Sequence, residues 1–437
     1  MEETTETDTG AVLRRAPFSD NPRVGVRGQR TQQRILDAAL RVFGDVGYHQ
    51  CSIDTITKLA GCSRVSFYQY FESKEDVFRH LAVQVARQLN ASTDLLDPVT
   101  PDLAGWETMR AWVGRYADIY ARYEPVFNAF PAAAESDETL IGDSVRTAHR
   151  YLSGIRTRVT KTAVPARDLD EVIDLLRACL GRTLDDVSIL HTAAPDAFPA
   201  AVILDAFTDV VHRSLFGLNP AVNVHRPRVR RSPKVPFGPV MTSAFDEDLE
   251  STDAVTGGPA RAALLAAGRE VFVTRGFHGT RVDDVVDAAG VSHGAFYRYF
   301  KNKDELAHLL AAQAMRTVSK SFLEIPSMSN DVNADRTVLR RWLRTYNQAQ
   351  VNEAAMIRVW VDAALQDAAL LADSASVLDW GRRRMAHYLQ PRDFGDPDTD
   401  AVVLLALVDT FGVREASARA VDAAAAIIER GFLGRVL

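Results

Sequence analysis

Residues 63–75 read SRVSFYQYFESKE and residues 292–304 read SHGAFYRYFKNKD, so the chain carries nearly the same motif twice. With Phe43 aligned to Phe272, residues 35–78 match residues 264–307 without a gap. Identical residues of the first copy include Gly47, His49, Asp54, Ala60, Gly61, Ser63, Phe67, Tyr68, Tyr70, Phe71 and Lys74. Their partners in the second copy are Gly276, His278, Asp283, Ala289, Gly290, Ser292, Phe296, Tyr297, Tyr299, Phe300 and Lys303. The chain therefore contains an internal repeat.

The composition is that of an ordinary globular protein. The 437 residues are 47% hydrophobic and 25% charged, and a chain of this length is expected to form roughly two to four domains. Abundant Ala and Arg favour helix. No apolar run approaches the ~18 residues of a membrane span, and the polar N-terminus lacks a signal-peptide pattern. Three scattered cysteines form neither a disulfide framework nor a metal motif. We expect a reduced, cytoplasmic, mostly helical protein without a metal or cofactor.

Basic residues gather in two places although the net charge is −6. Six arginines precede or enter the first copy: Arg14, Arg15, Arg23, Arg27, Arg30 and Arg34. A second basic run, HRPRVRRSPK, covers residues 225–234 and precedes the acidic DEDLE. Either run is consistent with a solvated tail or with a DNA-contacting arm, because the distribution of charge matters more than its sum.

The repeated segment has the pattern of a helix-turn-helix. Apolar residues recur at helical spacing between Ile35 and Val46, and Gly47 is expected to end that helix. Ser52 is positioned to cap a second helix, whose inward residues would be Ile53, Ile56, Leu59 and Ala60. Gly61 then turns the chain and Ser63 opens a third helix, at the spacing of a helix-turn-helix.

The third helix divides into two faces. Phe67, Tyr70 and Phe71 share the inward face, whereas Arg64 and Tyr68 share the opposite one. An outward arginine can bind guanine with two hydrogen bonds, and an outward tyrosine can reach a phosphate. The next helix is expected to begin with capping boxes: Ser73 with Asp76, and Asn302 with Glu305. The aromatic residues would also form a core in a protein that does not bind DNA.

These residues resemble the DNA-binding domain of the TetR family of transcriptional regulators, matched twice. RVFGDVGY, KLAGCS, FYQYF and ESKEDV fill the family's pattern in the first copy, and EVFVTRGF, DAAGVS, FYRYF and KNKDEL fill it in the second. The resemblance covers about fifty residues in each copy and is faint over the remainder. It implies an all-α fold of two tandem units, each a three-helix helix-turn-helix domain followed by a helical-bundle domain for ligand binding and dimerisation.

The resemblance also implies DNA contacts at matching positions. Phosphate contacts are implied for Ser63, Tyr68 and Lys74 and for Ser292, Tyr297 and Lys303. Base-edge contacts are implied for Arg64, Val65, Ser66, Gln69 and Tyr70 and for His293, Gly294, Ala295, Arg298 and Tyr299. At the start of the second helix the family favours Thr, but this chain has Ser52 and Arg281, both of which we include as phosphate contacts. Arg281 has no oxygen with which to cap that helix, so Thr280 is the alternative cap.

The resemblance places a ligand pocket in the helical domain of each half. We expect aromatic and methionine side chains at helical spacing to line it: Trp112, Tyr116, Tyr120 and Phe127, and Trp342, Tyr346, Met356 and Trp360. Such side chains are also common in plain cores. Trp342 and Tyr346 align with Trp112 and Tyr116 once one residue is inserted, which indicates that the whole unit is repeated.

The expected domain order follows from these matches and from a Pro-rich, charged connection between the halves. The predicted segments are a flexible basic arm (1–28), a first helix-turn-helix domain (29–82), a first helical domain (83–218), a linker (219–257), a second helix-turn-helix domain (258–312) and a second helical domain (313–437). The apolar stretches 196–217 and 400–433 need a partner, and we expect the two halves to pair within one chain.

The sequence therefore predicts a DNA-binding transcriptional regulator. It would act as a covalent pseudo-dimer on an asymmetric DNA operator under the control of a small, largely apolar ligand; resemblance alone favours a repressor. The alternative is a regulator in which only one helix-turn-helix reads DNA and the other serves assembly or protein interaction. No catalytic motif supports an enzyme. Further association into a homodimer stays open.

Overall fold

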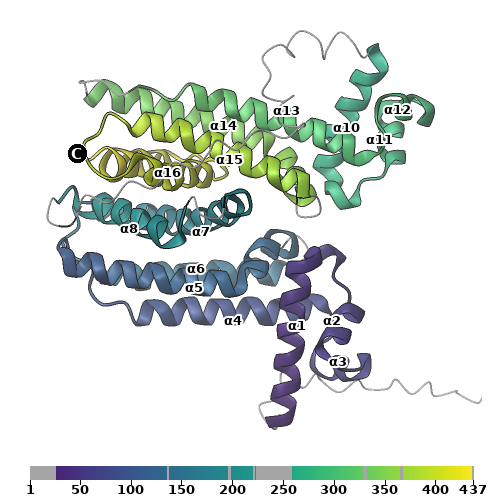
Figure 1. Ribbon diagram of the computed structural model, residues 1–437, viewed down its shortest axis with the longest axis horizontal. Helices are drawn as coiled ribbons and strands as arrows, with labels where there is room; N and C mark the ends of the chain where they lie inside the picture. Colours follow the sequence, from purple (N-terminus) through teal and green to yellow (C-terminus); the bar gives the residue numbers. More distant parts are fainter. Residues whose placement is uncertain are drawn as a thin grey trace, which may run out of the picture. The chain divides into compact units, whose positions relative to one another are not determined.

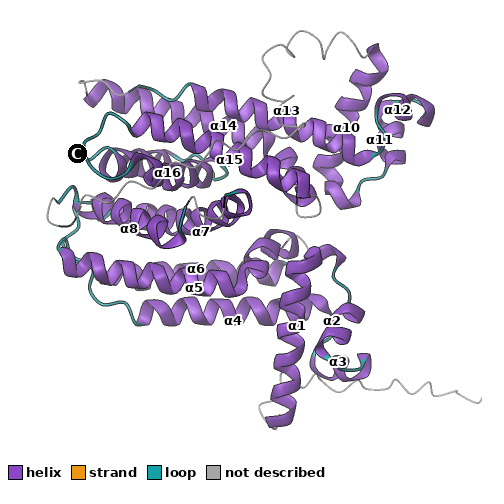
Figure 2. Cartoon of the chain, in the orientation of Figure 1, coloured by secondary structure: helices purple, strands orange, loops and turns teal. Residues whose placement is uncertain are grey.

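The computed structural model describes residues 26–134, 137–194, 198–219, 222, 258–327, 332–364 and 368–435. Arg14, Arg15, Arg23 and the basic run 225–234 lie outside these residues. The described residues form helices and no strand, which confirms the predicted all-α fold (Figure 2). None of the described helices combines the length and the apolarity that a membrane crossing requires.

The helices follow the repeat. Those of the first half are α1 (Val26–Gln50), α2 (Ile53–Ala60), α3 (Arg64–Tyr70), α4 (Lys74–Asp94), α5 (Leu103–Ala134), α6 (Glu138–Arg158), α7 (Leu169–Ala193) and α8 (Ala200–Phe216). Those of the second half are α10 (Gly258–Gly279), α11 (Val282–Ala289), α12 (His293–Tyr299), α13 (Lys303–Leu323), α14 (Val332–Ala364), α15 (Ala368–Leu389), α16 (Pro397–Gly412), α17 (Ala418–Ile427) and a short π-helix (Ile428–Phe432). Figure 1 labels most of them.

The chain forms two compact units. Unit 1 comprises the residues up to Asn90 together with Ile119–Ala148, and unit 2 comprises Ala91–Asp118 together with the residues from His149 onward. Unit 1 therefore holds the first helix-turn-helix and the adjoining ends of α4, α5 and α6. Unit 2 holds the remainder, including the second helix-turn-helix.

Unit 1 is built on the core that the repeat predicts. Phe67 and Phe71 are fully buried, and Tyr70 is buried with 8% of its surface exposed. On α2 one inward assignment is wrong: Leu59 is 49% exposed, and Thr57 is buried in its place. Gly47 has a positive φ of 77° but an extended ψ of 165°, so it kinks α1 rather than ending it in the left-handed conformation. Glycine adopts this φ without the steric penalty of a Cβ atom.

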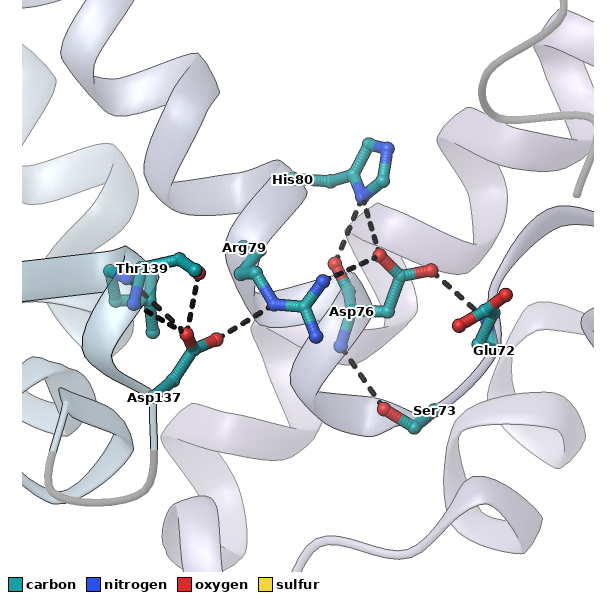
Figure 3. Close-up of polar contacts among 8 residues, drawn as sticks. Glu72, Ser73, Asp76, Arg79, His80, Asp137 and Thr139 are labelled. Atoms are coloured by element: carbon teal, nitrogen blue, oxygen red, sulfur yellow. Dashed lines mark hydrogen bonds and ion pairs between the residues drawn. The ribbon is translucent and has the colours of Figure 1, made fainter. Parts of the chain in front are cut away.

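Figure 3 shows how α4 is fixed inside unit 1. The backbone N–H of Asp76 donates to Ser73 Oγ (3.2 Å), and the carboxylate of Asp76 accepts from the N–H of Glu72 (3.0 Å). The Ser73 half of the predicted capping box is therefore present, whereas the acid bonds the residue before the cap and not the cap itself. One turn on, Arg79 Nε donates to Asp137 Oδ2 (2.7 Å), and the other oxygen of Asp137 accepts from the N–H of Thr139 at the start of α6. Asp137 therefore joins α4 to α6.

In unit 2 the second helix-turn-helix packs directly on α13 and α14. Its core contains Phe296 and Phe300, the counterparts of Phe67 and Phe71. Met356 and Trp360 of α14 belong to the same core. These two predicted pocket residues therefore connect α14 to the second helix-turn-helix. Their aromatic and sulfur groups are buried by helix packing, which the spacing of apolar residues alone does not distinguish from a pocket.

The terminal helices of the two halves pack against each other within unit 2. Helix α7 contacts α15, α16 and α17, and α8 contacts α16, α17 and the π-helix (Figure 1). Side chains of both halves meet here: Arg182 Nη2 of α7 donates to Asp409 Oδ2 of α16 (3.3 Å), and Cys179 lies against the carbonyl of Val403. The apolar stretches that lacked a partner in the sequence are buried in this contact.

Candidate nucleic-acid interface

The first helix-turn-helix is fixed by three local devices. Ser52 caps α2 by accepting from the N–H of Thr55 (3.2 Å), and Ser63 caps α3 by accepting from the N–H of Ser66 (3.1 Å). Gly61 between them adopts the left-handed conformation, with φ 62° and ψ 43°. Each cap satisfies a backbone donor that would otherwise lack a partner at a helix start. The turn and both helix starts therefore agree with the sequence prediction.

A fourth contact at this turn was not predicted. The guanidinium of Arg34 on α1 donates to the carbonyl oxygen of Gly61 (2.9 Å) and to that of Ala60. A cation at a helix C-terminus is favourable because the carbonyl dipoles point toward it. The second copy has Ala263 at the matching position, so this contact belongs to the first copy alone. In the sequence Arg34 could be assigned only to the basic run.

The predicted reading residues of α3 mostly lie on the surface. Arg64, Val65, Tyr68 and Gln69 are exposed, and Ser66 is half-buried. Tyr70 is the exception: its ring is buried in the core of unit 1, so it does not belong to the exposed reading face. The sequence had assigned it to both faces, and its spacing from Phe67 supports the inward one.

The second copy repeats this arrangement with different side chains. His293, Gly294, Tyr297 and Arg298 of α12 are exposed, whereas Ala295 and Tyr299 are half-buried. Ser292 caps α12 through the N–H of Ala295 (3.2 Å). The scaffold is thus the same in both copies, and the exposed face differs.

A side-chain hydrogen-bond contact links the two helices of each helix-turn-helix. In the first copy both Nε and Nη2 of Arg64 donate to the carboxylate of Asp54 on α2. In the second copy His293 Nε2 lies 2.6 Å from Asp283 Oδ1 on α11. Asp54 and Asp283 occupy matching positions of the repeat, and this identity was the one signal in the sequence that could have pointed to the contact.

The start of α11 differs from that of α2. Arg281 occupies the capping position, and its backbone N–H donates to Asp284 Oδ2 (2.8 Å). Arg275 on α10 pairs with the same carboxylate, and the bond from the N–H of Arg281 lowers the pKa of Asp284. Thr280 does not cap the helix, since its hydroxyl donates to the carbonyl of Gly276 (2.7 Å). The acid at the third position of α11 therefore satisfies the N–H of Arg281, whereas the hydroxyl of Ser52 satisfies an N–H inside α2.

The two predicted phosphate lysines hold the protein's own backbone. Lys74 Nζ lies within hydrogen-bond distance of the carbonyl oxygens of Tyr48 (3.1 Å), His49 (3.4 Å) and Cys51 (3.5 Å). Lys303 Nζ donates to the carbonyls of Phe277 (2.9 Å) and Thr280 (3.1 Å). Each ammonium also lies over an aromatic ring, 4.8 Å from the Tyr48 centroid and 4.6 Å from the Phe277 centroid. These contacts explain a cation in the first turn of a helix without invoking a phosphate.

The predicted pocket residues do not converge. A small apolar cavity of about 40 Å³ lies among α5, α6, α7 and α8 of unit 2, and only Trp112 of the eight lines it. Tyr116 is buried beside Trp112, with ring centroids 6.4 Å apart. Tyr120 and Phe127 contact each other in unit 1 (5.1 Å). Aromatic spacing identified the helix face but not which part of it borders the cavity.

In the second half the matching aromatic residues are packed together. The ring of Phe322 lies 6.5 Å from Trp342, 5.0 Å from Tyr346 and 6.3 Å from Trp380. The indole N–H of Trp342 donates to the carbonyl of Ser321 (2.8 Å), and the hydroxyl of Tyr346 donates to Asp409 (2.6 Å). Both polar groups are therefore satisfied by the protein.

Comparison with known proteins finds the same family model in both helix-turn-helix segments. The family model "Bacterial regulatory proteins, tetR family" matches residues 35–81 and 264–310. The chain is 34% identical over 70 residues to the uncharacterized HTH-type transcriptional regulator YdgC of Bacillus subtilis, which covers 16% of this chain and 36% of YdgC. It is 48% identical over 46 residues to the HTH-type transcriptional activator FasR of Mycolicibacterium smegmatis, covering 10% and 21%.

A longer match is weaker. The chain is 26% identical over 187 residues to the HTH-type transcriptional repressor Rv1474c of Mycobacterium tuberculosis, covering 42% of this chain and 94% of that protein. By contrast, the chain covers little more than a third of the length of YdgC. The family model itself covers only the two helix-turn-helix segments.

Proposed function

We propose that this chain, which carries two TetR-family DNA-binding domains in tandem, is a transcriptional regulator that binds one asymmetric DNA operator with both domains. The observation that carries the proposal is the pair of reading helices. Each is held by the same serine cap and the same aromatic core, and each exposes a different set of side chains. Arg64 and Gln69 are exposed in the first copy, and His293 and Arg298 in the second.

The packing of the two halves supports a pseudo-dimer. A symmetric dimer of identical chains reads two identical half-sites related by a two-fold axis. Here α7 and α8 of the first half pack on α15–α17 and the π-helix of the second half within unit 2. Because both halves belong to one chain, the two reading helices are free to differ. We therefore expect two unlike half-sites.

Control by a small, largely apolar ligand is part of the proposal. The cavity beside Trp112 is lined almost wholly by aliphatic and aromatic residues, with Arg177 as its charged member. At about 40 Å³ it is far smaller than the roughly 300–1,000 Å³ of a typical ligand site, so a ligand must displace side chains to enter. Such a displacement would move α5 to α8 and thereby release the protein from DNA.

The sense of regulation rests on resemblance. The relative with the longest match described above is named a repressor, and another with a shorter match is named an activator. We propose repression on the longer match. A reporter gene placed behind the operator decides it: expression that rises when the chain is deleted supports repression, and expression that falls supports activation.

DNA footprinting on the full chain tests the operator. DNA selected from a random duplex library should contain two unlike half-sites, and scrambling either half should weaken binding. Equal binding to perfect inverted repeats of either half would overturn the asymmetric operator. Loss of binding on scrambling one half only would favour the alternative, in which the other domain serves assembly. The mass of the complex in solution shows whether one chain or two occupy the operator.

A further inference from the structure

The first residue of each reading helix is held by an aspartate from the preceding helix. Asp54 accepts two hydrogen bonds from Arg64, and Asp283 lies 2.6 Å from His293 Nε2. All four side chains are more than half exposed, so these contacts lie on the surface that carries the reading residues. The same two positions are thus in contact in both copies. The aspartate contacts a permanently charged side chain, Arg64, in the first copy and a titratable one, His293, in the second.

We propose that Asp54 and Asp283 position the first side chain of each reading helix, and that the exchange of Arg64 for His293 makes base recognition by the second helix-turn-helix dependent on pH. This inference rests on the proposed DNA-binding function.

In the first copy the contact leaves a defined edge of the guanidinium. Asp54 takes Nε and Nη2 of Arg64, which together form one side of the planar group. The remaining edge, Nη1 with the second hydrogen of Nη2, has the two parallel donors that match O6 and N7 of guanine. A side chain already held by Asp54 loses less rotational freedom on binding DNA. Arg64 keeps its charge at every physiological pH, so the first half-site is read in the same way throughout.

In the second copy the chemistry of the contact depends on protonation. A carboxylate only accepts hydrogen bonds, so Nε2 of His293 must carry the proton shared with Asp283. In the neutral imidazole Nδ1 is then an acceptor, which suits the amino group of adenine or cytosine. In the charged imidazole Nδ1 is a donor, which suits guanine. Histidine is the side chain that changes charge between about pH 5 and 8.

Acidic side chains of α11 lie around His293. Helix α12 packs on α10 and α11. On α11 Asp283 contacts His293 directly, and Asp287 stands where the first copy has Lys58. Asp284 of α11 pairs with Arg275 of α10, and Arg298 is the cation of α12 itself. DNA phosphates add further negative charge on binding. Binding to the second half-site should therefore take up a proton and become tighter as the pH falls.

A reciprocal exchange tests the inference. A duplex is first selected by the unaltered chain from a random library at about pH 6. The full chain, His293→Arg and Arg64→His are then titrated against this duplex by fluorescence anisotropy at about pH 6 and about pH 8. We expect the unaltered chain to bind about tenfold more tightly at the lower pH, the factor of one good base contact. His293→Arg should remove this dependence, and Arg64→His should add a second dependence located in the first half-site.

Asp283→Asn is the second variant, because an amide does not favour a charged imidazole. It should reduce both the pH dependence and the base preference at the position that His293 contacts, while preference in the first half-site is kept. An unchanged pH dependence in His293→Arg, or an unchanged base preference in Asp283→Asn, would overturn this inference and leave the proposed function standing. If the unaltered chain selects no duplex at either pH, the proposed function falls, and the inference falls with it.

Discussion

Arg213 on α8 and Asp400 on α16 form a buried ion pair between the two halves, with Nη2 3.1 Å from Oδ2. Their side chains are 1% and 3% exposed, and Arg392 shares the same carboxylate at 2.7 Å. Arg213 Nε also donates to the carbonyl of Gly431 (2.6 Å). One carboxylate thus compensates two buried guanidinium groups that lie far apart in sequence.

Replacement of Asp400 should therefore loosen the packing of the two halves. Asp400→Asn is expected to lower the free energy of unfolding by about 3–5 kcal/mol, because it removes the carboxylate that both buried guanidinium groups contact. Asp143→Asn is the matched control, since Asp143 forms an exposed pair with Arg146 worth less than about 1 kcal/mol. Urea denaturation of both variants gives the comparison. Equal losses would show that the buried pair does not hold the halves together.

Substitutions on the exposed face of α3 should distinguish the residue that reads a base from the residue that contacts a phosphate. Arg64→Ala is expected to weaken binding by about 1–3 kcal/mol and to relax the preference at one base pair. Tyr68→Phe should weaken binding about equally on all sequences, because a phosphate contact carries no sequence information. Tyr70→Phe is the control, since that ring lies in the core. A change of base preference in Tyr70→Phe would contradict the assignment of the two faces.

The sequence predicted the scaffold because local chemistry determines it. Serine caps, a glycine in the left-handed region and aromatic spacing act within a few residues of one another, so the helix-turn-helix could be read directly. Asp54 with Arg64 and Lys74 with Tyr48 are separated by 10 and 26 residues. Such contacts depend on how the helices pack, which no periodicity specifies. The predicted pocket residues depend on packing in the same way: a stripe of aromatics indicates a buried face, and only tertiary packing decides where that face borders a cavity.

Lys74 should stabilise the fold of unit 1 in addition to its predicted contact with a DNA phosphate. Lys74→Met keeps the aliphatic stem but loses the contacts to three carbonyls at the end of α1, so unit 1 should lose about 1.5–3 kcal/mol, the range for hydrogen bonds to a charged group. Hydrogen exchange of the α1 and α4 amides measures the loss in the absence of DNA. Lys58→Met on the exposed side of α2 serves as the control and should leave exchange unchanged. If the amides of Lys74→Met are as well protected from hydrogen exchange as those of the unaltered chain, Lys74 does not stabilise unit 1, and a phosphate contact is the role that is left for it.

The start of α4 should be sensitive to acid. Burial alone would raise the pKa of Asp76, but the hydrogen bonds from His80 and from the N–H of Glu72 outweigh it, and the pKa is lowered. A carboxyl whose pKa is lower in the folded state stabilises the fold above its ordinary pKa of about 3.9, and this stabilisation is lost as the pH falls through the lowered value. Asp76→Asn should therefore show a smaller loss of unit 1 stability between about pH 5 and pH 2 than the unaltered chain. Asp45→Asn, at an exposed position of α1, should behave like the unaltered chain.

The two equivalent tryptophans should respond differently to the same substitution. Trp112 and Trp342 are both buried, and Phe in place of either removes the same volume. The indole N–H of Trp342 donates to the carbonyl of Ser321, whereas that of Trp112 has no hydrogen-bond partner among the described residues. Trp342→Phe loses a hydrogen bond, and Trp112→Phe removes a buried donor that is already unsatisfied. Trp342→Phe should therefore cost about 1–3 kcal/mol more in unfolding free energy than Trp112→Phe.

Thermal and urea unfolding of the two variants give this difference directly. The difference also bears on ligand control. The indole N–H of Trp342 already donates to Ser321, whereas the indole N–H of Trp112 lies beside an apolar cavity and could donate to a bound ligand. A ligand that accepts this hydrogen bond should stabilise the unaltered chain more than Trp112→Phe, and its effect on Trp342→Phe should match its effect on the unaltered chain. Equal costs for the two substitutions, or the reverse order, would show that the two halves do not differ at this position.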